Sequence, residues 1–370
     1  MQHCDLVGPI PSTISGLTNL SQLHLAGNRL INNIPPEIID LIHLTSINLN
    51  NNALSAEIPS TLSYLNQWTL LSLGNNKLTG TIPTAISTLS RLVTLSIYNN
   101  CISGTIPSAL NNLSYLEKLS LQKNELTGSL PSSLGDLSNL EYLLVGTNHL
   151  TGTIPMEYST ILSLVDFGMG KNLIHGTVPT TFDVLLNINT ISMDVNSLTG
   201  TVPSQLFILL KLLYIDISEN MFSSTMPTSI GMLTKLLLLS THHNSISGSI
   251  PTEICLISGL VHLHLAHNPI HHSIPSHIGN LTRLLDLDLD NMFLTGSLPT
   301  SILAMKHLTR LFVYTNSLTG TIPGLFGYYI DTLIQVDLHQ NQFTGPIPST
   351  IGNLTRMEHL FLSENIFTGP

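Results

Sequence analysis

Apolar and polar positions recur along this chain with a period of 24 residues. Between Leu116 and Pro131 the sequence reads LEKLSLQKNELTGSLP, with leucines at 116, 119, 121 and 126 and an asparagine at 124. A fixed period that runs through a whole chain is the signature of a solenoid of stacked repeats. The repeated asparagine stands at 28, 52, 76, 100, 124, 148, 172, 196, 220, 244, 268, 316, 341 and 365.

Each repeat predicts three short segments. The stretch LxxLxL alternates like a strand, so we expect one parallel sheet with leucines inward and the intervening residues outward. The asparagine amide both donates and accepts, so it can bond buried turn backbone within and between repeats. The glycine four residues later suits a tight bend, and the proline of the IP pair ends a short lateral strand. The remaining stretch is too short for an α-helix and predicts 3-10 turns.

Together these segments predict an α/β-type repeat solenoid, a curved superhelix with about fifteen parallel strands. The sheet of short strands should form its concave face, and the 3-10 turns its convex face. Two irregularities interrupt the register. Met292 occupies one asparagine position, and one extra residue lies within 324–331, so that Asn341 follows 25 residues after Asn316. We expect the insertion to bulge on the outer face while Val336 and Leu338 stay in the core.

The repeat resembles the plant-type leucine-rich repeat family, whose pattern is LxxLxLxxNxLTGxIPxxLGxLxxL. The residues that carry the resemblance are LVTLSIYNNCISGTIPSALNNLSYL from Leu92 and LTRLFVYTNSLTGTIPGLF from Leu308. The resemblance covers essentially the whole chain and implies a single leucine-rich repeat domain over residues 1–370. The paired-cysteine caps that usually close such solenoids are absent at both ends, so we expect a piece of a longer protein, truncated and uncapped at each end.

Composition narrows the classes of function. Charged residues make up 9% of the chain and the net charge is -10, whereas binding to nucleic-acid phosphates needs clustered Lys and Arg. Nucleophile elbows, phosphate loops, zinc-protease pairs and dinucleotide fingerprints are missing from the sequence, so we expect neither an enzyme nor a cofactor. Pro, Asn and Gly interrupt the apolar residues, so the sequence holds no run of about 20 that could span a bilayer.

The outward strand positions lie six, four and two residues before each repeated asparagine. Over most of the chain they hold Ser, Asn, Gly and Thr, but between residues 214 and 314 they gather histidine, aspartate, arginine and aromatic residues. Aromatic residues and Arg are common hot spots of binding surfaces, so this is the predicted partner surface, although an ordinary solvated face is the competing interpretation. Its members are Tyr214, Asp216, His242, His262, His264, Asp286, Asp288, Asp290, Arg310, Phe312 and Tyr314.

Two histidines and three aspartates dominate this surface. We expect His262 to lie beside Asp286, and His264 beside Asp288, on neighbouring parallel strands. Such residues can hold a divalent metal, but the predicted set is flat, so charge pairing is favoured and no metal site is assigned. A nearby carboxylate favours the imidazolium form, so both histidines are expected to have a raised pKa and to make binding depend on pH.

Four glycosylation sequons fall in the predicted outer turns, where a glycan would be tolerated. The family pattern GNLT generates such sequons by itself, so they say little about secretion. Their asparagines are Asn19, Asn112, Asn280 and Asn353.

The resemblance implies a binding scaffold at the cell surface or outside the cell. The favoured interpretation is the recognition ectodomain of a receptor-like protein or receptor-like kinase that binds a protein, peptide or small hormone on the concave face or its flanks. A secreted binder similar to polygalacturonase-inhibiting proteins is the alternative. A third interpretation rests on the threonines of LTGTIP, which could form a flat array that binds ice or glycan.

Overall fold

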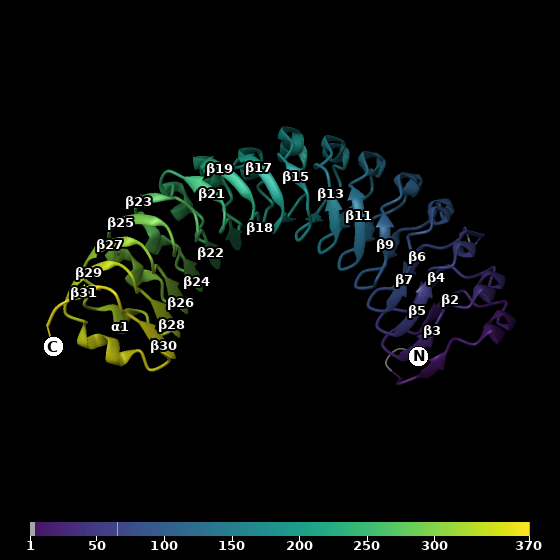
Figure 1. The fold of residues 1–370 in the computed structure, drawn as a ribbon, viewed down its shortest axis with the longest axis horizontal. Coiled ribbons are helices and arrows are strands. Elements are labelled where there is room, and N and C mark those ends of the chain that lie inside the picture. Colours follow the sequence, from purple (N-terminus) through teal and green to yellow (C-terminus); the bar gives the residue numbers. More distant parts are fainter. Residues whose placement is uncertain (1–3, 65, 370) are drawn as a thin grey trace. The chain divides into compact units, whose positions relative to one another are not determined.

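The structure is a computed structural model that describes residues 4–64 and 66–369. It forms two compact units, Met1–Ile188 and Asn189–Pro370. Each unit stacks successive repeats, as the ribbon shows in the change from purple to teal for the first unit and from green to yellow for the second (Figure 1). The sequence period continues through residue 188 without a break, and the single-domain organisation stays a prediction.

One parallel sheet runs through each unit, built from the strand that precedes each repeated asparagine. In the first unit its strands are β2 (Gln22–His24), β4 (Ser46–Asn48), β6 (Leu70–Ser72), β8 (Thr94–Ser96), β10 (Lys118–Ser120), β12 (Tyr142–Leu144) and β14 (Asp166–Gly168). In the second unit they are β16 (Thr190–Ser192), β18 (Tyr214–Asp216), β20 (Leu238–Ser240), β22 (His262–His264), β24 (Asp286–Asp288), β26 (Arg310–Phe312), β28 (Gln335–Asp337) and β30 (His359–Phe361). These fifteen described strands confirm the predicted number, and we call this sheet the inner sheet of each unit.

Lateral strands follow the asparagines. They are β1 (Val7–Pro9), β3 (Arg29–Asn32), β5 (Ala53–Glu57), β7 (Lys77–Thr79), β9 (Ser103–Thr105), β11 (Glu125–Ser129), β13 (His149–Thr151) and β15 (His175–Gly176) in the first unit. In the second they are β17 (Ser197–Thr201), β19 (Met221–Thr225), β21 (Ser245–Ser247), β23 (His271–Ser273), β25 (Phe293–Ser297), β27 (Ser317–Gly320), β29 (Gln342–Gly345) and β31 (Ile366–Phe367).

Short 3-10 helices complete the repeats on the side opposite the inner sheet, as predicted. Those of the first unit are η1 (Ser12–Gly16), η2 (Pro36–Asp40), η3 (Ser60–Tyr64), η4 (Thr84–Thr88), η5 (Ser108–Asn112), η6 (Ser132–Asp136), η7 (Met156–Thr160) and η8 (Thr180–Val184). Those of the second are η9 (Ser204–Ile208), η10 (Thr228–Met232), η11 (Thr252–Leu256), η12 (Ile278–Asn280), η13 (Thr300–Ala304) and η14 (Ser349–Asn353), with one α-helical turn, α1 (Phe326–Tyr329).

The repeated asparagine links neighbouring repeats through buried hydrogen bonds. The side-chain amide of Asn124 donates to the carbonyl oxygens of Ile97 (3.1 Å) and Leu121 (3.0 Å), and its oxygen accepts the backbone N–H of Ile102 (3.0 Å). A buried polar group left without such a partner costs roughly 1–3 kcal/mol. We call the run of these side chains the asparagine ladder. Its amides form hydrogen bonds with backbone N–H and carbonyl groups of the turns that the lateral strands alone do not pair.

The residue before most ladder asparagines adopts a left-handed backbone, with φ between 48° and 66° at the ladder positions from 28 to 365. The bend is imposed on whatever residue stands there, including the β-branched Val195 at 51°. Such residues are sterically disfavoured in this region, so the stacking of the repeats overrides local preference. Among these residues are His243 and His267, and their ring centroids stack at 3.9 Å.

The two irregularities are accommodated differently. The insertion forms α1 in place of a 3-10 helix, while Val336 and Leu338 stay buried at 1% exposure, which confirms the predicted register of β28. Met292 is buried at 4% exposure in the ladder position. Asn124 accepts a hydrogen bond from the N–H of Ile102, which stands 22 residues before it. Ile270 stands 22 residues before Met292, and Met292 has no amide oxygen to accept its N–H.

Candidate functional site

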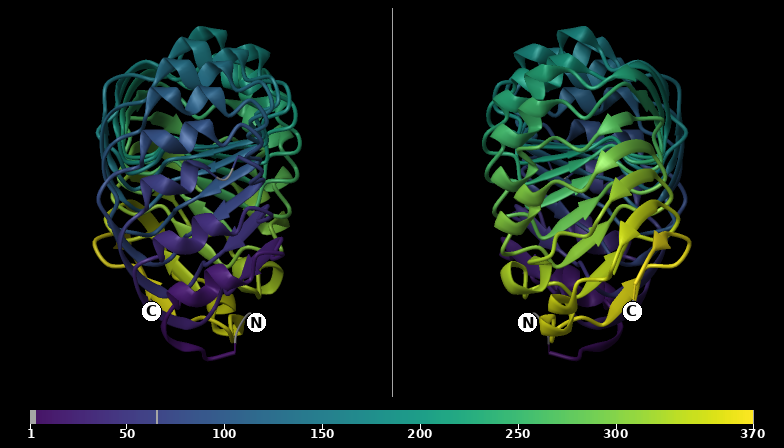
Figure 2. Two further views of the ribbon diagram at one scale, coloured as in Figure 1. Left: turned by 90° about the vertical axis from the view of Figure 1, so that its right-hand side faces the viewer. Right: turned by 90° about the vertical axis from the view of Figure 1, so that its left-hand side faces the viewer.

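The predicted partner surface lies on the outward face of the inner sheet of the second unit. Strands β22, β24, β26 and β28 follow one another there, and Figure 2 (right) shows the strands of this unit side by side in green and yellow. The register pairs His262 with Asp286 and Asp286 with Arg310, and it pairs His264 with Asp288. Both predicted His–Asp neighbour pairs are therefore confirmed. We call His262, His264, Asp286, Asp288, Asp290, Arg310, Phe312 and Tyr314 the inner-sheet patch.

Asp286 lies at the centre of a charged network. Its two carboxylate oxygens accept hydrogen bonds from the Arg310 guanidinium at 2.5 and 2.7 Å, and one of them also contacts the His262 ring nitrogen Nδ1 at 2.5 Å. Burial opposes ionisation of Asp286, but the hydrogen bonds and charge of Arg310 outweigh it and lower the pKa of this carboxyl. Asp286 is only 4% exposed, so its negative charge is stabilised by the neighbouring side chains rather than by water.

The pKa of His264 differs from the prediction. Burial lowers the pKa of His264, and the charge of Asp286, which raises it, does not compensate. Burial likewise lowers the pKa of His242, whose Nδ1 lies 2.9 Å from the Ser240 hydroxyl. The expected raised pKa is therefore wrong for His264, because loss of water around the ring disfavours imidazolium more than the nearby carboxylate favours it.

Asp288 and Asp290 form a carboxyl–carboxylate pair. Burial, together with the hydrogen bond and the charge of Asp290, raises the pKa of Asp288 to about 8. Burial also works against ionisation of Asp290, but hydrogen bonds from Asp288, Asn291 and Tyr314 lower its pKa. Because only one carboxyl of the pair ionises readily, Asp288 stays protonated and donates a hydrogen bond to the Asp290 carboxylate. One oxygen of Asp288, Oδ1, is buried without a hydrogen-bond partner among the described residues.

Three members of the predicted surface stand apart from this cluster. Tyr214 is 42% exposed on β18, two strands away from β22. Asp216 accepts hydrogen bonds from the backbone N–H and the hydroxyl of Ser218, at 3.1 and 2.5 Å. His242 approaches the cluster through its ring, whose centroid lies 6.4 Å from that of His264. The charged cluster therefore occupies the β22–β26 part of the predicted surface.

The surface also continues beyond its predicted limit at Tyr314. The His339 ring stacks on Tyr314 with centroids 4.7 Å apart, and its Nδ1 lies 2.5 Å from an Asp337 oxygen. His267 Nε2 lies 3.3 Å from Asp290. Asp337 and His339 occupy the outward columns of the next repeat, so extending the columns past the insertion would have found them. His267 precedes a ladder asparagine, a position outside those columns.

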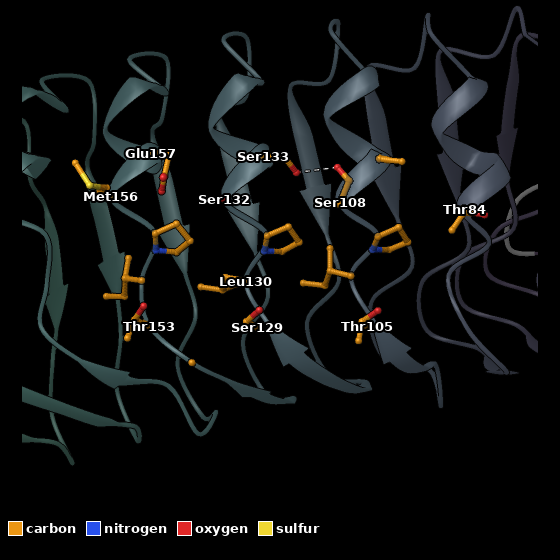
Figure 3. Close-up of a pocket in the computed structure, with 17 residues that line it drawn as sticks. Thr84, Thr105, Ser108, Ser129, Leu130, Ser132, Ser133, Thr153, Met156 and Glu157 are labelled. Atoms are coloured by element: carbon orange, nitrogen blue, oxygen red, sulfur yellow. Dashed lines mark hydrogen bonds between the residues drawn. The ribbon is translucent and has the colours of Figure 1, made fainter.

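A second regular surface lies beside the lateral strands of the first unit. A groove there is lined by Thr105, Ser129 and Thr153, with Met156 and Glu157 at one end, and Figure 3 shows the three hydroxyl residues in a single row. All three are exposed. The row is part of a longer column, Thr81, Thr105, Ser129, Thr153 and Thr177, which we call the hydroxyl row.

Glycines fix the side chains of the hydroxyl row. Gly128 has φ +76°, and a Cβ added to it would lie 2.8 Å from the Thr105 methyl Cγ2. Gly104 has the same relation to Thr81, at 2.9 Å. The glycine is therefore needed for two reasons: it adopts the positive φ of the bend, and it leaves room for the threonine of the preceding repeat. Each threonine methyl packs against the next repeat.

All four sequon asparagines are exposed in the outer turns, so the structure leaves room for glycans at each. Asn112, Asn280 and Asn353 are the last residues of η5, η12 and η14, and Asn19 lies in the turn after η1. In the described part of the chain, every helix is too short or too polar to cross a bilayer.

Comparisons with known proteins agree with the fold. Residues 90–150 match the leucine rich repeat family, and so do single repeats at 43–65, 67–89, 259–281 and 332–354. No curated protein gave a significant match to the sequence. Many solved structures share the fold, among them structures of two plant receptor kinases and of a plant ice-binding protein.

The first is the ectodomain of the membrane receptor kinase GASSHO1/SCHENGEN3 from Arabidopsis thaliana in complex with CASPARIAN STRIP INTEGRITY FACTOR 2, with TM-score 0.87 and 36% identity over 99% of this chain. The second is the Arabidopsis receptor kinase HAESA with the peptide hormone IDA and the co-receptor SERK1, with TM-score 0.88 and 31% identity over 98%. This chain spans 47% of the first structure's length and 65% of the second's. The third is a plant ice-binding protein, with TM-score 0.56 and 27% identity over 66% of this chain and 79% of that one.

Proposed function

Because this chain is a leucine-rich repeat protein that structurally resembles plant receptor-kinase ectodomains, we propose that it binds an extended peptide on the inner-sheet patch, without catalysis, outside the cell. The observation that carries the proposal is the patch itself. Its arginine, aromatic and acidic residues stand in register on adjacent strands, on a sheet face that elsewhere presents mainly small polar residues. The likeness to structures that hold peptide hormones supports the same role.

The geometry suits a peptide that crosses the strands. Parallel strands lie about 4.8 Å apart, so the three strands from β22 to β26 span roughly 10 Å. An extended peptide rises about 3.3 Å per residue, so about three residues would cover that distance. The half-exposed side chain of Arg310 and the rings of Phe312 and Tyr314 would provide the contacts that carry most of the affinity.

A displayed library of random linear peptides tests this proposal. Peptides selected on the wild-type chain should bind the Arg310→Ala and Tyr314→Ala variants at least about tenfold more weakly, since truncating a hot-spot side chain costs about 2 kcal/mol or more. Phe293→Ala is the matched control, because Phe293 is an equally large ring, 65% exposed, on the lateral strand β25. Peptides that lose affinity only on the control variant would place binding outside the patch.

The same fold could serve a free-standing inhibitor of another protein, and the identity of the partner is what separates that role from a receptor's. An inhibitor needs a folded protein as its partner, whereas the receptor proposal needs a short peptide. Failure of the peptide selection together with binding of a folded enzyme to the same patch variants would favour the inhibitor.

The hydroxyl row supports a third candidate function, binding of ice. Its hydroxyls and methyls repeat about every 4.8 Å across the strands, which gives a flat and regular array, and a plant ice-binding protein shares the fold. A thermal-hysteresis measurement tests it. Wild type should show hysteresis and Thr105→Lys with Thr153→Lys should abolish it, while the absence of hysteresis in wild type would remove this candidate.

A further inference from the structure

We propose that His262, His264 and Asp286 form a site for a late first-row divalent metal ion of the zinc class. One ligand atom from each of these side chains lies within 4.8 Å of the other two. The set was expected to be flat from sequence, but the side chains converge across two strands. Binding of a metal here is independent of the peptide proposal, although both use the same patch.

The donor set has the right chemistry. Two imidazoles and one carboxylate suit Zn²⁺ and its neighbours, and three protein ligands leave a coordination position open for water or a partner group. With metal–ligand distances of about 2.0–2.2 Å, the donor atoms of a tetrahedral site lie about 3.4 Å apart. The His262–Asp286 pair already lies closer than that, at 2.5 Å, so the main adjustment is rotation of the half-buried His264 ring toward the pair.

The metal takes the place of the hydrogen bond between His262 and Asp286. In the neutral imidazole, the proton on Nδ1 moves through water to Nε2, and Nδ1 then offers its lone pair to the ion. No oxidant, reductant or other reactant is needed, because the ring keeps its proton, which only moves from Nδ1 to Nε2.

Arg310 is the main opposing charge, since it holds both oxygens of Asp286. A carboxylate oxygen has two lone pairs, so Asp286 can keep the Arg310 bond on one and use the side now facing His262 for the metal. Arg310 then orients the ligand from behind, as outer partners of metal ligands commonly do.

Titration of the untagged full chain with Zn²⁺ by calorimetry, and with Co²⁺ by its visible absorption, tests the site. We expect one saturable equivalent and a Co²⁺ spectrum of low coordination number. The His264→Ala variant removes one ligand and leaves the Asp286–Arg310 pair intact, so it should lower the affinity at least tenfold. Asp286→Asn should do the same while preserving the shape of the side chain.

The control is His271→Ala with His272→Ala. These two histidines are exposed neighbours on the lateral strand β23, with ring centroids 4.3 Å apart, and lie outside the proposed site. This double variant should bind the metal like wild type, and hydrogen exchange of the inner-sheet amides should show that every variant keeps its fold. The proposal is overturned if wild type binds no metal saturably, or if the control loses the metal while His264→Ala and Asp286→Asn retain it.

Discussion

Replacing Met292 by asparagine should repair the gap in the asparagine ladder. In the preceding repeat, the Asn268 oxygen accepts the backbone N–H of Ile246 at 2.9 Å, and its amide donates to the carbonyl oxygens of Thr241 and Leu265, both at 2.9 Å. At the next position Met292 can make none of these bonds, and the N–H of Ile270 lacks the equivalent acceptor. The Met292→Asn variant supplies the missing side chain.

The magnitude follows from two opposing terms. One acceptor bond and two or three donor bonds, each worth about 0.5–1.5 kcal/mol net, stabilise the variant by roughly 1.5–6 kcal/mol, with a central value of about 3–4 kcal/mol. Met292 is 4% exposed, and removing a buried methionine side chain costs about 1.5–3 kcal/mol. The central value of the polar term exceeds that of the burial term. We expect a net gain of about 1 kcal/mol in the free energy of unfolding, a factor of about five in local protection.

Hydrogen exchange is the most direct assay, since unfolding of a repeat array need not be two-state. The Ile270 amide should exchange about five times more slowly in Met292→Asn, and the denaturant midpoint should rise. Met232→Asn is the matched control, because Met232 is 51% exposed on η10 and makes no ladder contact, so it should change neither quantity. An Ile270 amide that exchanges at the wild-type rate or faster, or a midpoint that falls, would show that the ladder term does not exceed the burial term.

Two further predictions concern backbone packing and pH. Gly327→Ala should destabilise the last repeats by about 1–3 kcal/mol, the usual range for overpacking, because its added Cβ would lie 1.7 Å from the Thr350 carbonyl oxygen. Gly352→Ala is the control, because a Cβ added there would have nothing within 4 Å. Equal denaturant midpoints for the two variants would contradict this prediction. For Asp288, the pKa of about 8 lies above the unfolded value, so the folded state holds a proton that the unfolded state loses between about pH 4 and 8. Stability should therefore fall as pH rises through that window, by at most about 1.4 kcal/mol per unit, and Asp288→Asn should remove this contribution; urea midpoints measured across the window test it, and an unchanged pH slope in the variant would refute the assignment.

The repeat register was predictable because stacking converts a sequence period into spatial neighbours. Residues 24 apart become partners on adjacent parallel strands, so His262 and Asp286 could be placed side by side from their numbers alone. The same rule predicted the core positions Val336 and Leu338 across the insertion, since alternation within a strand survives an extra residue in the outer turn. Local pattern and tertiary packing agree at these positions.

Burial on the outward face could not be predicted in this way. Whether Asp288 or His264 keeps its water depends on the sizes of side chains on the strands at both sides, which no period encodes. Sequence reasoning treated these positions as outward and therefore solvated, whereas Asp286 and Asp290 are 4% and 3% exposed. The predicted charge state of His264 consequently failed, although its predicted neighbours were right. The left-handed backbone at Val195 is a similar case, because a local preference gives way to the stacked turn.

The buried carboxyls of the inner-sheet patch are not required by the fold. Outward positions on the other inner strands hold side chains such as Ser72 and Ser96, and those strands pair in the same register. Burying Asp288 against Asp290 is a cost, since one of them must keep at neutral pH a proton that a free aspartate loses near pH 4. In a chain with only 9% charged residues, three aspartates on consecutive outward positions of one repeat therefore need a reason outside stability. Binding of a cation is such a reason. A peptide amine, a guanidinium or a divalent metal at this face would favour ionisation of Asp288, and the resulting charge attraction would contribute to the binding free energy. This explanation requires that the pKa of Asp288 falls when the cation is added, which NMR of its carboxyl carbon can follow.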